Sequence, residues 1–332
     1  MFLGDYRVEI IPDCEFSLDG GAMFGVVPRV VWERVCPPDE LNRVKLTCNC
    51  LFIDTGKEKI LIETGMGEKW RPKQISMYGI KREKSLAESL QDIAGCGPED
   101  IDIVINTHLH FDHAGGNTIA GPAPGAQISS LGAQTSSPET FASLPGTQAT
   151  RLPRRVFEGG SVNDIQHEDA RETRAIPAVA QFPNAHYLVS KSEFNAAENP
   201  HERDRASYLS ENWHPLIESQ QLDLMPDAYE PVEGLIIEQV RGHSETMQTI
   251  KLTRGGETLF GFFDMIPTRH HLPLPWIMSY DLFPTKTLEF KKRILPQALD
   301  ENWICHFYHD VEMPLCRLAE VNGKIVAVGI EN

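Results

Sequence analysis

Three histidines and one aspartate fall within the six positions from 108 to 113, in the segment Thr107-His-Leu-His-Phe-Asp-His-Ala-Gly-Gly116. Neutral imidazole nitrogens and carboxylate oxygens are the ligands that divalent first-row metals take in proteins. In an extended segment alternate side chains point the same way, so His108 and His110 can share one ion, while Asp112 and His113, beyond the bend, serve a second. The segment therefore predicts a site for two adjacent metal ions.

The elements around this segment are those of an α/β protein. Hydrophobic patterning predicts strands at 7–11, 44–53, 60–63, 101–106, 235–240, 247–252, 258–263 and 303–307, and helices at 85–94 and 287–299. A strand entry at 181–190 leads into a short helix, and Asn322-Gly323 predicts a hairpin turn. These strands and helices fall into two similar halves of the chain, and such halves fit a two-sheet sandwich covered by helices. The histidines follow the strand at 101–106, and open α/β sheets place their chemistry at such strand ends.

The composition and net charge of the chain limit the kinds of molecule that it is expected to bind. The chain has 332 residues, 41% hydrophobic and 23% charged, with a formal net charge of −16. An acidic protein has no basic field for nucleic acid or anionic lipid, so we expect neither as a partner. No apolar run is long enough to cross a membrane, and charges break any signal-peptide core near the N-terminus. We expect a cytoplasmic protein, with the seven cysteines as buried thiols rather than a disulfide framework.

One stretch lacks the apolar residues that a core needs. No charged residue occurs from 114 to 138, and small or polar residues dominate as far as about 150. Such a stretch can bury only little apolar surface, too little to offset the conformational entropy that it would lose on becoming ordered. We therefore expect a flexible insertion at about 119–180, as a loop or a lid, within a single domain spanning 1–332.

The segment at 107–116 resembles the T-H-x-H-x-D-H-A-G-G signature of the metallo-β-lactamase superfamily, and Leu109 with Phe111 makes it most similar to the N-acyl homoserine lactonase-like hydrolase branch. Four further stretches are similar to family elements and occur in the family's order: 62–67, 242–244, 260–264 and 307–310. The resemblance implies a four-layer αββα sandwich. It also implies one or two divalent metal ions, with zinc as the first expectation and manganese or iron as alternatives, and no organic cofactor.

The family's roles can be carried onto the residues that match. The implied metal ligands are His108 and His110 for the first ion, Asp112, His113 and His309 for the second, and Asp264 as the bridge between both. Asp112 is also the implied catalytic residue that moves a proton. Glu63 stands where the family usually has an aspartate that orients a ligand histidine, and a glutamate can accept the same hydrogen bond. The chain also contains Asp54-Thr-Gly56, which is similar to Glu63-Thr-Gly65. We interpret Asp54 as part of a hairpin turn.

Met247 is the departure that bears on the number of metal ions. The family's G-H-S/T-x-x-H-Q element ends in a third histidine for the first ion, whereas this chain reads Gly242-His-Ser-Glu-Thr-Met-Gln248. A thioether is a soft, weak ligand beside imidazole and carboxylate. If Met247 is a core residue, the first ion loses a ligand and binds more loosely. His243 is then a possible substitute ligand, and His186 a more remote one.

The function that this resemblance implies is a metal-dependent hydrolase, in which a metal-bound hydroxide attacks a lactone or a related ester of small-molecule size. Two alternatives stay open. A single iron could support dioxygenase chemistry on the same fold, or the chain could be a degenerate relative without activity. The loop at 270–284 is either a packed Pro-rich loop or an aromatic rim for the substrate. Oligomeric state is left open.

Overall fold

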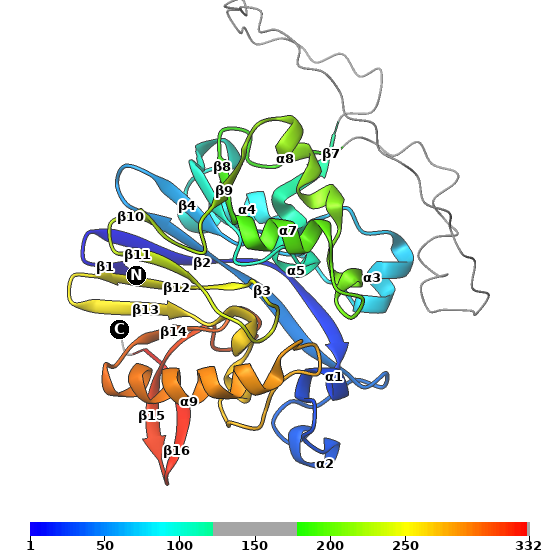
Figure 1. The fold of residues 1–332 in the computed structure, drawn as a ribbon, viewed down its shortest axis with the longest axis vertical. Helices are drawn as coiled ribbons and strands as arrows, with labels where there is room; N and C mark the ends of the chain where they lie inside the picture. Colours follow the sequence, from blue (N-terminus) through cyan, green and yellow to red (C-terminus); the bar gives the residue numbers. More distant parts are fainter. Residues whose placement is uncertain (122–177, 331–332) are drawn as a thin grey trace, which may run out of the picture. The chain divides into compact units, whose positions relative to one another are not determined.

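Two β-sheets carry the core of the chain. The computed structural model describes residues 1–121 and 178–330, which Figure 1 shows as a ribbon. In spatial order, the first sheet contains β1 (Phe2–Leu3), β2 (Tyr6–Asp19), β3 (Arg43–Asp54), β4 (Lys59–Ile62), β5 (Ile103–Ile105), β8 (His186–Ser190) and β9 (Leu222–Met225). The second sheet contains β10 (Ala228–Val232), β11 (Leu235–Gln239), β12 (Gln248–Arg254), β13 (Glu257–Gly261), β14 (Ile304–His306), β15 (Leu315–Val321) and β16 (Lys324–Val328).

Helices cover the outer faces of the sheets. The helices in the described part of the chain are α1 (Gly20–Phe24), α2 (Arg29–Trp32), α3 (Pro72–Tyr78), α4 (Leu86–Ala94), α5 (Phe111–Ala114), α7 (Lys191–Glu198), α8 (His214–Glu218) and α9 (Pro284–Asp300). The α4 helix packs on β2, α7 on β8 and β9, and α9 on β15, so the layers are helices, sheet, sheet, helices (Figure 1). The α/β sandwich expected from the sequence is confirmed. No helix in the described ranges combines the length and apolarity needed to cross a membrane.

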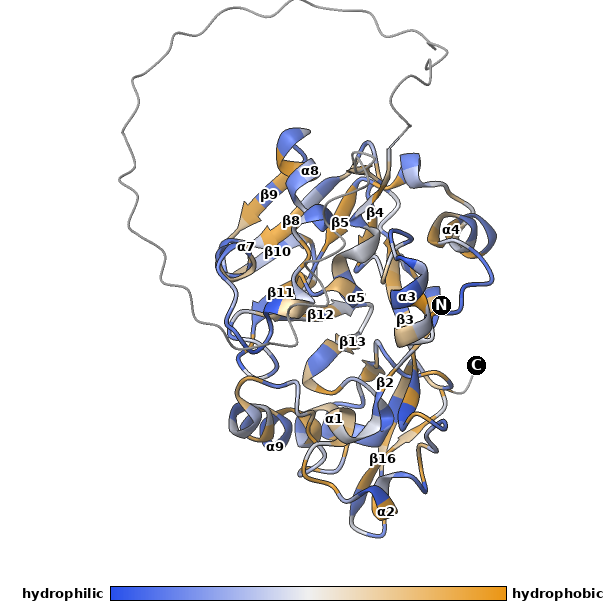
Figure 2. Cartoon of the chain, turned by 90° about the vertical axis from the view of Figure 1, so that its right-hand side faces the viewer, coloured by the Kyte–Doolittle hydropathy of each residue, from blue (hydrophilic) through white to orange (hydrophobic). Residues whose placement is uncertain are grey.

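The patterning of the sequence explains these layers. The α4 helix begins with a capping box, in which Ser85 accepts from the Glu88 amide, and ends at Gly95 in the left-handed conformation. It buries Leu86 and Leu90 against the first sheet. In Figure 2 the strands β5 and β9 are mainly hydrophobic in colour, whereas much of α9 is hydrophilic. The interior holds one large cluster of buried apolar side chains, to which both sheets contribute.

The first strand is longer than the 7–11 that the sequence predicted. The β2 strand pairs with β3 from Arg7↔Asp54 to Asp19↔Arg43, and its register shifts between Pro12 and Glu15. A β-bulge takes up the extra residue at this point, so the strand continues past a proline that would otherwise end it. The Asp54 carboxylate accepts from the Gly56 amide at 2.8 Å in the turn to β4, which confirms its predicted place in a hairpin.

The predicted insertion begins and ends in a short ladder. The strands β6 (Thr118–Ala120) and β7 (Ala178–Ala180) pair in antiparallel fashion, with Ile119 opposite Val179. The rest of the predicted insertion lies outside the described residues.

Parallel strand pairs bring the ligand-bearing loops to one edge. The β4 and β5 strands are parallel, with Ile62 opposite Ile105, so Glu63 and the histidine segment leave adjacent strands at the same end. The β13 and β14 strands are also parallel, with Gly261 opposite His306. The turn after β13 and the loop after β14 therefore emerge side by side, and they carry the predicted ligands of the second half of the chain.

Candidate metal centre

Loops from both sheets deliver six predicted ligands and His243 to one place. His108 and His110 follow β5, while Asp112 and His113 lie on α5. His243 lies in the loop before β12, Asp264 in the turn of 3-10 helix at Phe263–Met265 after β13, and His309 in the loop after β14. All seven side chains are buried, and they form an interior cluster of imidazoles and carboxylates.

The first group contains three histidines and one aspartate. His108, His110, His243 and Asp264 each offer one ligand atom, and these atoms lie within 4.8 Å of one another. His243 Nε2 is 3.2 Å from Asp264 Oδ2 and 3.1 Å from His110 Nδ1, and His108 Nε2 is 3.9 Å from the same aspartate oxygen. Four donors of this kind, all close to one point, make the set that a single divalent ion needs.

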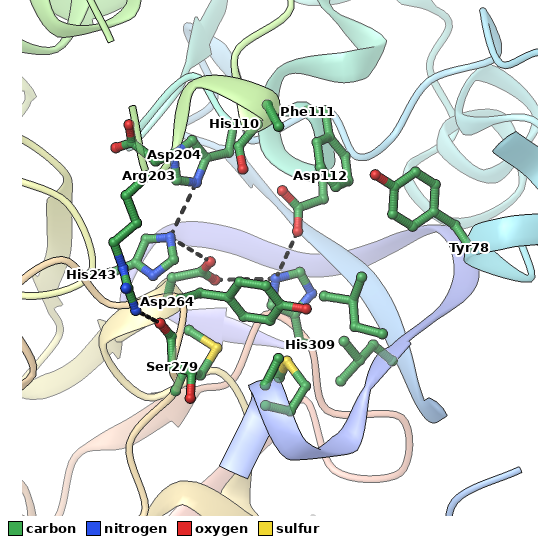
Figure 3. Close-up of a pocket in the computed structure, with 18 residues that line it drawn as sticks. Tyr78, His110, Phe111, Asp112, Arg203, Asp204, His243, Asp264, Ser279 and His309 are labelled. Carbon is green, nitrogen blue, oxygen red and sulfur yellow. Dashed lines mark hydrogen bonds and ion pairs between the residues drawn. The ribbon is translucent and has the colours of Figure 1, made fainter. Parts of the chain in front are cut away.

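The second group shares the same aspartate. Asp112, His113, Asp264 and His309 also offer atoms within 4.8 Å of one another. Asp264 Oδ1 is 3.2 Å from His113 Nε2. The same oxygen is 3.1 Å from His309 Nε2, and Asp112 Oδ2 is 3.6 Å from His309 Nε2 (Figure 3). One oxygen of Asp264 thus faces each group, which is the arrangement of a bridging carboxylate.

Two of the donor atoms are better explained as metal ligands than as members of a hydrogen-bond network. The Nε2 atoms of His108 and His110 are buried and have no hydrogen-bond partner among the described residues. A buried polar atom left in this way costs about 1–3 kcal/mol, and native proteins rarely keep one without a reason. Burial, followed by the neighbouring histidines, lowers the pKa of both imidazoles well below the usual range. Both rings are therefore neutral, and the neutral form is the one that binds a metal.

Asp264 is held as a carboxylate. Burial alone would raise its pKa, but the imidazoles of His113, His243 and His309 lower it well below the usual value. A negative charge between the two groups of imidazoles would partly offset the positive charge of divalent cations held there.

Glu63 lies behind the second group, where the sequence placed an orienting acid. Its backbone is left-handed, with φ of +64°, and its carboxylate is completely buried. The Oε1 atom accepts from the Thr107 amide at 3.0 Å and from the Thr107 hydroxyl, and it lies 3.4 Å from His113 Nδ1. Glu63 therefore contacts the ring nitrogen of His113 that points away from Asp264.

The third imidazole of the first group comes from His243, and the expectation that Met247 depletes this group is corrected. Met247 is completely buried in the hydrophobic core, and its amide donates to the Ser244 hydroxyl at 2.9 Å. The loop before β12 turns His243, not residue 247, toward Asp264. His186 is exposed on β8 and pairs with Asp223 at 2.8 Å, so it takes no part in the cluster.

A cavity of about 370 Å³ opens onto the cluster. Its floor is formed by His110, Asp112, His243, Asp264 and His309. Its apolar lining comes from Leu18, Ala22, Met23, Leu46, Tyr78, Phe111, Met278 and Tyr280, and its polar lining from Arg203, Asp204, Ser207 and Ser279. Figure 3 shows Arg203 reaching toward Ser279, whose carbonyl accepts a hydrogen bond from the guanidinium. The cluster is thus reached through a partly apolar pocket rather than from a flat surface.

Part of the loop at 270–284 is a rim of this cavity, since Met278, Ser279 and Tyr280 line it. Part is also packed structure. The Lys291 ammonium is buried and donates to the carbonyls of Pro273 and Trp276 at 2.7 and 2.9 Å. Both interpretations of this loop therefore describe a portion of it.

Glu193 is a buried carboxylate that sequence reasoning missed. It accepts from the Leu109 amide at 2.8 Å, from the Tyr208 hydroxyl at 3.1 Å and from the Thr246 hydroxyl. Burial raises its pKa. Leu109 lies between two of the histidines, and Thr246 follows His243 in the same loop. Glu193 therefore joins the two loops that carry the first group, and no local pattern near it indicates this.

Comparison with known proteins agrees with this geometry. A model of the metallo-beta-lactamase superfamily matches residues 43–169. An N-acyl homoserine lactonase of Bacillus cereus is 32% identical over 85 residues, which is 23% of this chain and 34% of that protein. The chain thus spans about a third of the length of the curated lactonases that it matches.

Solved structures resemble the chain over its whole length. A probable metal-dependent hydrolase from Staphylococcus aureus has a TM-score of 0.76 and 24% identity, covering 100% of this chain and 99% of that one. AidC, a dizinc quorum-quenching lactonase in complex with the product N-hexanoyl-L-homoserine, has a TM-score of 0.68 and 18% identity, covering 100% and 97%. Residues 43–169 thus match the metallo-β-lactamase superfamily, and the whole chain shares its fold with these solved structures.

Proposed function

We propose that this protein is a metal-dependent hydrolase that uses two divalent ions, with zinc as the first candidate, to open a lactone or a related ester. The observation that carries this proposal is the place of Asp264, which presents one oxygen to each of two groups of imidazoles. A shared carboxylate between two donor sets is the design of a two-metal site.

The residues of the first site would be His108, His110, His243 and Asp264, and those of the second site Asp112, His113, Asp264 and His309. Bound there, divalent cations supply Lewis-acid polarisation of a carbonyl oxygen and lower the pKa of water.

Asp112 is the group placed to move a proton. Its carboxylate lines the cavity, and its Oδ2 atom lies 3.6 Å from His309 Nε2 at the floor. A carboxylate at this position can take a proton from attacking water and return it to a leaving alkoxide, provided it lies within hydrogen-bond reach of both. The proposed role needs no serine or cysteine nucleophile.

The walls of the cavity favour an uncharged substrate with an apolar portion. Leu18, Met23, Leu46 and Met278 line one part of it, and Tyr78, Phe111 and Tyr280 add aromatic surface. A volume of about 370 Å³ suits a small molecule rather than a polymer. The similarity to N-acyl homoserine lactonases supports acylated lactones as the first compounds to test.

A first group depleted by Met247 would favour the inactive relative and, to a smaller extent, the one-iron dioxygenase. His243 beside His108 and His110 gives the first group four donors, and this supports the two-metal hydrolase over both alternatives.

The test is metal content per chain by elemental analysis, combined with hydrolysis of a panel of acylated lactones and aryl esters. We expect about two ions per chain, hydrolysis of at least one class, and loss of activity after chelation that returns when zinc is added back. Oxygen consumption is measured in parallel. Iron with oxygen uptake and no hydrolysis would favour the dioxygenase, and two bound ions without turnover of any ester would overturn the proposed reaction.

A further inference from the structure

His243 is held between two carboxylates. Its Nε2 atom faces the cluster, 3.2 Å from Asp264 Oδ2, and its Nδ1 atom lies 3.2 Å from Asp281 Oδ1. Asp281 is 2% exposed, and its second oxygen accepts from the Thr287 hydroxyl at 2.6 Å. Each polar atom of the Asp281 carboxylate therefore has one partner, and one of these is the ring that the first metal site needs.

The segments carrying these residues are joined along their backbones. The Leu282 amide donates to the His243 carbonyl at 2.8 Å, and the Phe283 amide donates to the Gly242 carbonyl at 2.9 Å. A Cβ atom at Gly242 would lie 2.5 Å from Met265 Cε and 2.7 Å from Thr287 Oγ1, so a larger residue there would require these side chains to move. This close packing fixes the distance between His243 and the loop that carries Asp281.

The charge of Asp281 has no lysine or arginine partner within the described part of the chain, where its ion-pair contact is His243. A buried carboxylate without a full cation is costly unless its hydrogen bonds compensate. If Nδ1–H of His243 donates to Asp281, the lone pair of Nε2 is left facing the cluster. The same contact raises the basicity of the imidazole toward a metal.

We propose that Asp281, anchored by Thr287, is a positioning residue for the first metal ion. It sets the tautomer and orientation of His243 and thereby the affinity of the first site, while the second site, built from Asp112, His113 and His309, does not depend on it. This inference rests on the proposed two-metal function.

The experiment compares the full chain with Asp281→Asn and Thr287→Val. Each protein is loaded with zinc, and release to a chromophoric chelator is measured to give a dissociation constant for each site. His243→Ala identifies which step belongs to the first site. The control is Asp223→Asn, which alters an Asp–His pair of 2.8 Å on the exposed face of the first sheet.

We expect Asp281→Asn to weaken the first site by about 10- to 100-fold and to leave the second within about twofold. Thr287→Val should shift the first site in the same direction by less, and the control should shift neither. Thermal unfolding of the metal-free proteins checks that each is folded. Should Asp281→Asn fail to fold, the Thr287→Val result decides the matter alone.

Two results would overturn the inference. An unchanged first site in the folded variants means that Asp281 does not act through His243, and equal weakening of both sites means that the effect is general destabilisation. Failure of the proposed function looks different, because it shows in the unaltered protein, either as fewer than two bound zinc ions or as two bound ions without turnover of any ester.

Discussion

His243 and Asp264 approach within 3.2 Å because one hairpin carries both. The β12 and β13 strands pair in antiparallel fashion, with Ile250 opposite Gly261, so the start of one strand meets the end of the other. His243 precedes β12 and Asp264 follows β13, which puts both at the same edge of the second sheet. The first sheet supplies His108 and His110 across the interface, and the site therefore depends on the packing of the two sheets.

Asp264→Ala removes the group that both donor sets share. We expect turnover to fall by at least about 1,000-fold, because two cations would lose their common carboxylate. Metal content should fall as well, while the far-ultraviolet circular dichroism spectrum stays unchanged. Asp223→Ala, at the exposed pair with His186, is the control and should keep full activity. Full activity in Asp264→Ala would contradict the site assignment.

Met247 gives a prediction that separates a core residue from a ligand. Met247→Leu keeps the volume of the core, so we expect metal content to be unchanged and the free energy of unfolding to move by less than about 1.5 kcal/mol. Met247→His should destabilise by about 2–4 kcal/mol, since a polar ring would enter an apolar core without a partner. Elemental analysis and urea unfolding check both. A metal count that rises from one to two in Met247→His would mean that residue 247 faces the site.

The positions of His243 and Met247 show which parts of the site local sequence patterns can predict and which they cannot. The spacing of residues 108–113 predicted two groups of ligands because neighbouring side chains in one short segment have few possible directions. The choice between residues 243 and 247 depends on where β12 begins and which way the preceding loop turns. Tertiary packing decides this, since the core accepts Met247 and the cluster accepts an imidazole.

Apart from the loop at 270–284, the walls of the cavity could not be predicted from the sequence, for a related reason. The α1 and α3 helices have 5 and 7 residues. Isolated helices this short are unstable, and their sequences carry weak signals, so only contacts with the sheets fix them. Glu193 and Asp281 were missed because nothing local distinguishes a buried acid from an exposed one. Their partners, such as Leu109 and His243, lie 84 and 38 residues away in the chain.

Glu193→Ala tests whether the buried carboxylate holds the two loops of the first group together. Its loss leaves the Leu109 amide and the hydroxyls of Tyr208 and Thr246 without their acceptor. We expect a loss of about 2–4 kcal/mol in the free energy of unfolding, because unsatisfied buried donors carry their full desolvation cost. Catalytic efficiency should fall at the same time.

Urea unfolding and steady-state kinetics measure the two effects in Glu193→Ala. Glu198→Ala is the matched control on the same helix, where the carboxylate accepts from Trp213 Nε1 at 2.6 Å and lies 2.9 Å from His214 Nε2. Its removal should lower stability without changing catalytic efficiency. Equal effects of the two substitutions on catalytic efficiency would mean that Glu193 supports the helix and not the site.

We expect the buried ring of His271 to make the free energy of unfolding depend on pH. Its ring is buried, stacks on Phe24 at 4.9 Å, lies 2.9 Å from the Met23 carbonyl through Nε2, and contacts the Thr268 hydroxyl at 2.8 Å through Nδ1. Burial lowers its pKa to about 3. Between that value and about 6.5, the unfolded chain binds a proton that the folded chain excludes, so stability falls as the pH drops through this window and is unaffected above it.

His271→Phe should remove this acid sensitivity while keeping the stacking on Phe24. From the proton linkage, the substitution is expected to lessen the stability lost between pH 7 and pH 5 by about 2 kcal/mol. At pH 7 the variant should itself be less stable by about 1–2 kcal/mol, because two hydrogen bonds are lost. Urea unfolding of the metal-free proteins at both pH values gives the double difference, and His186→Gln on the surface is the control. An identical fall in stability for His271→Phe and the unaltered chain would mean that His271 is protonated in the folded state.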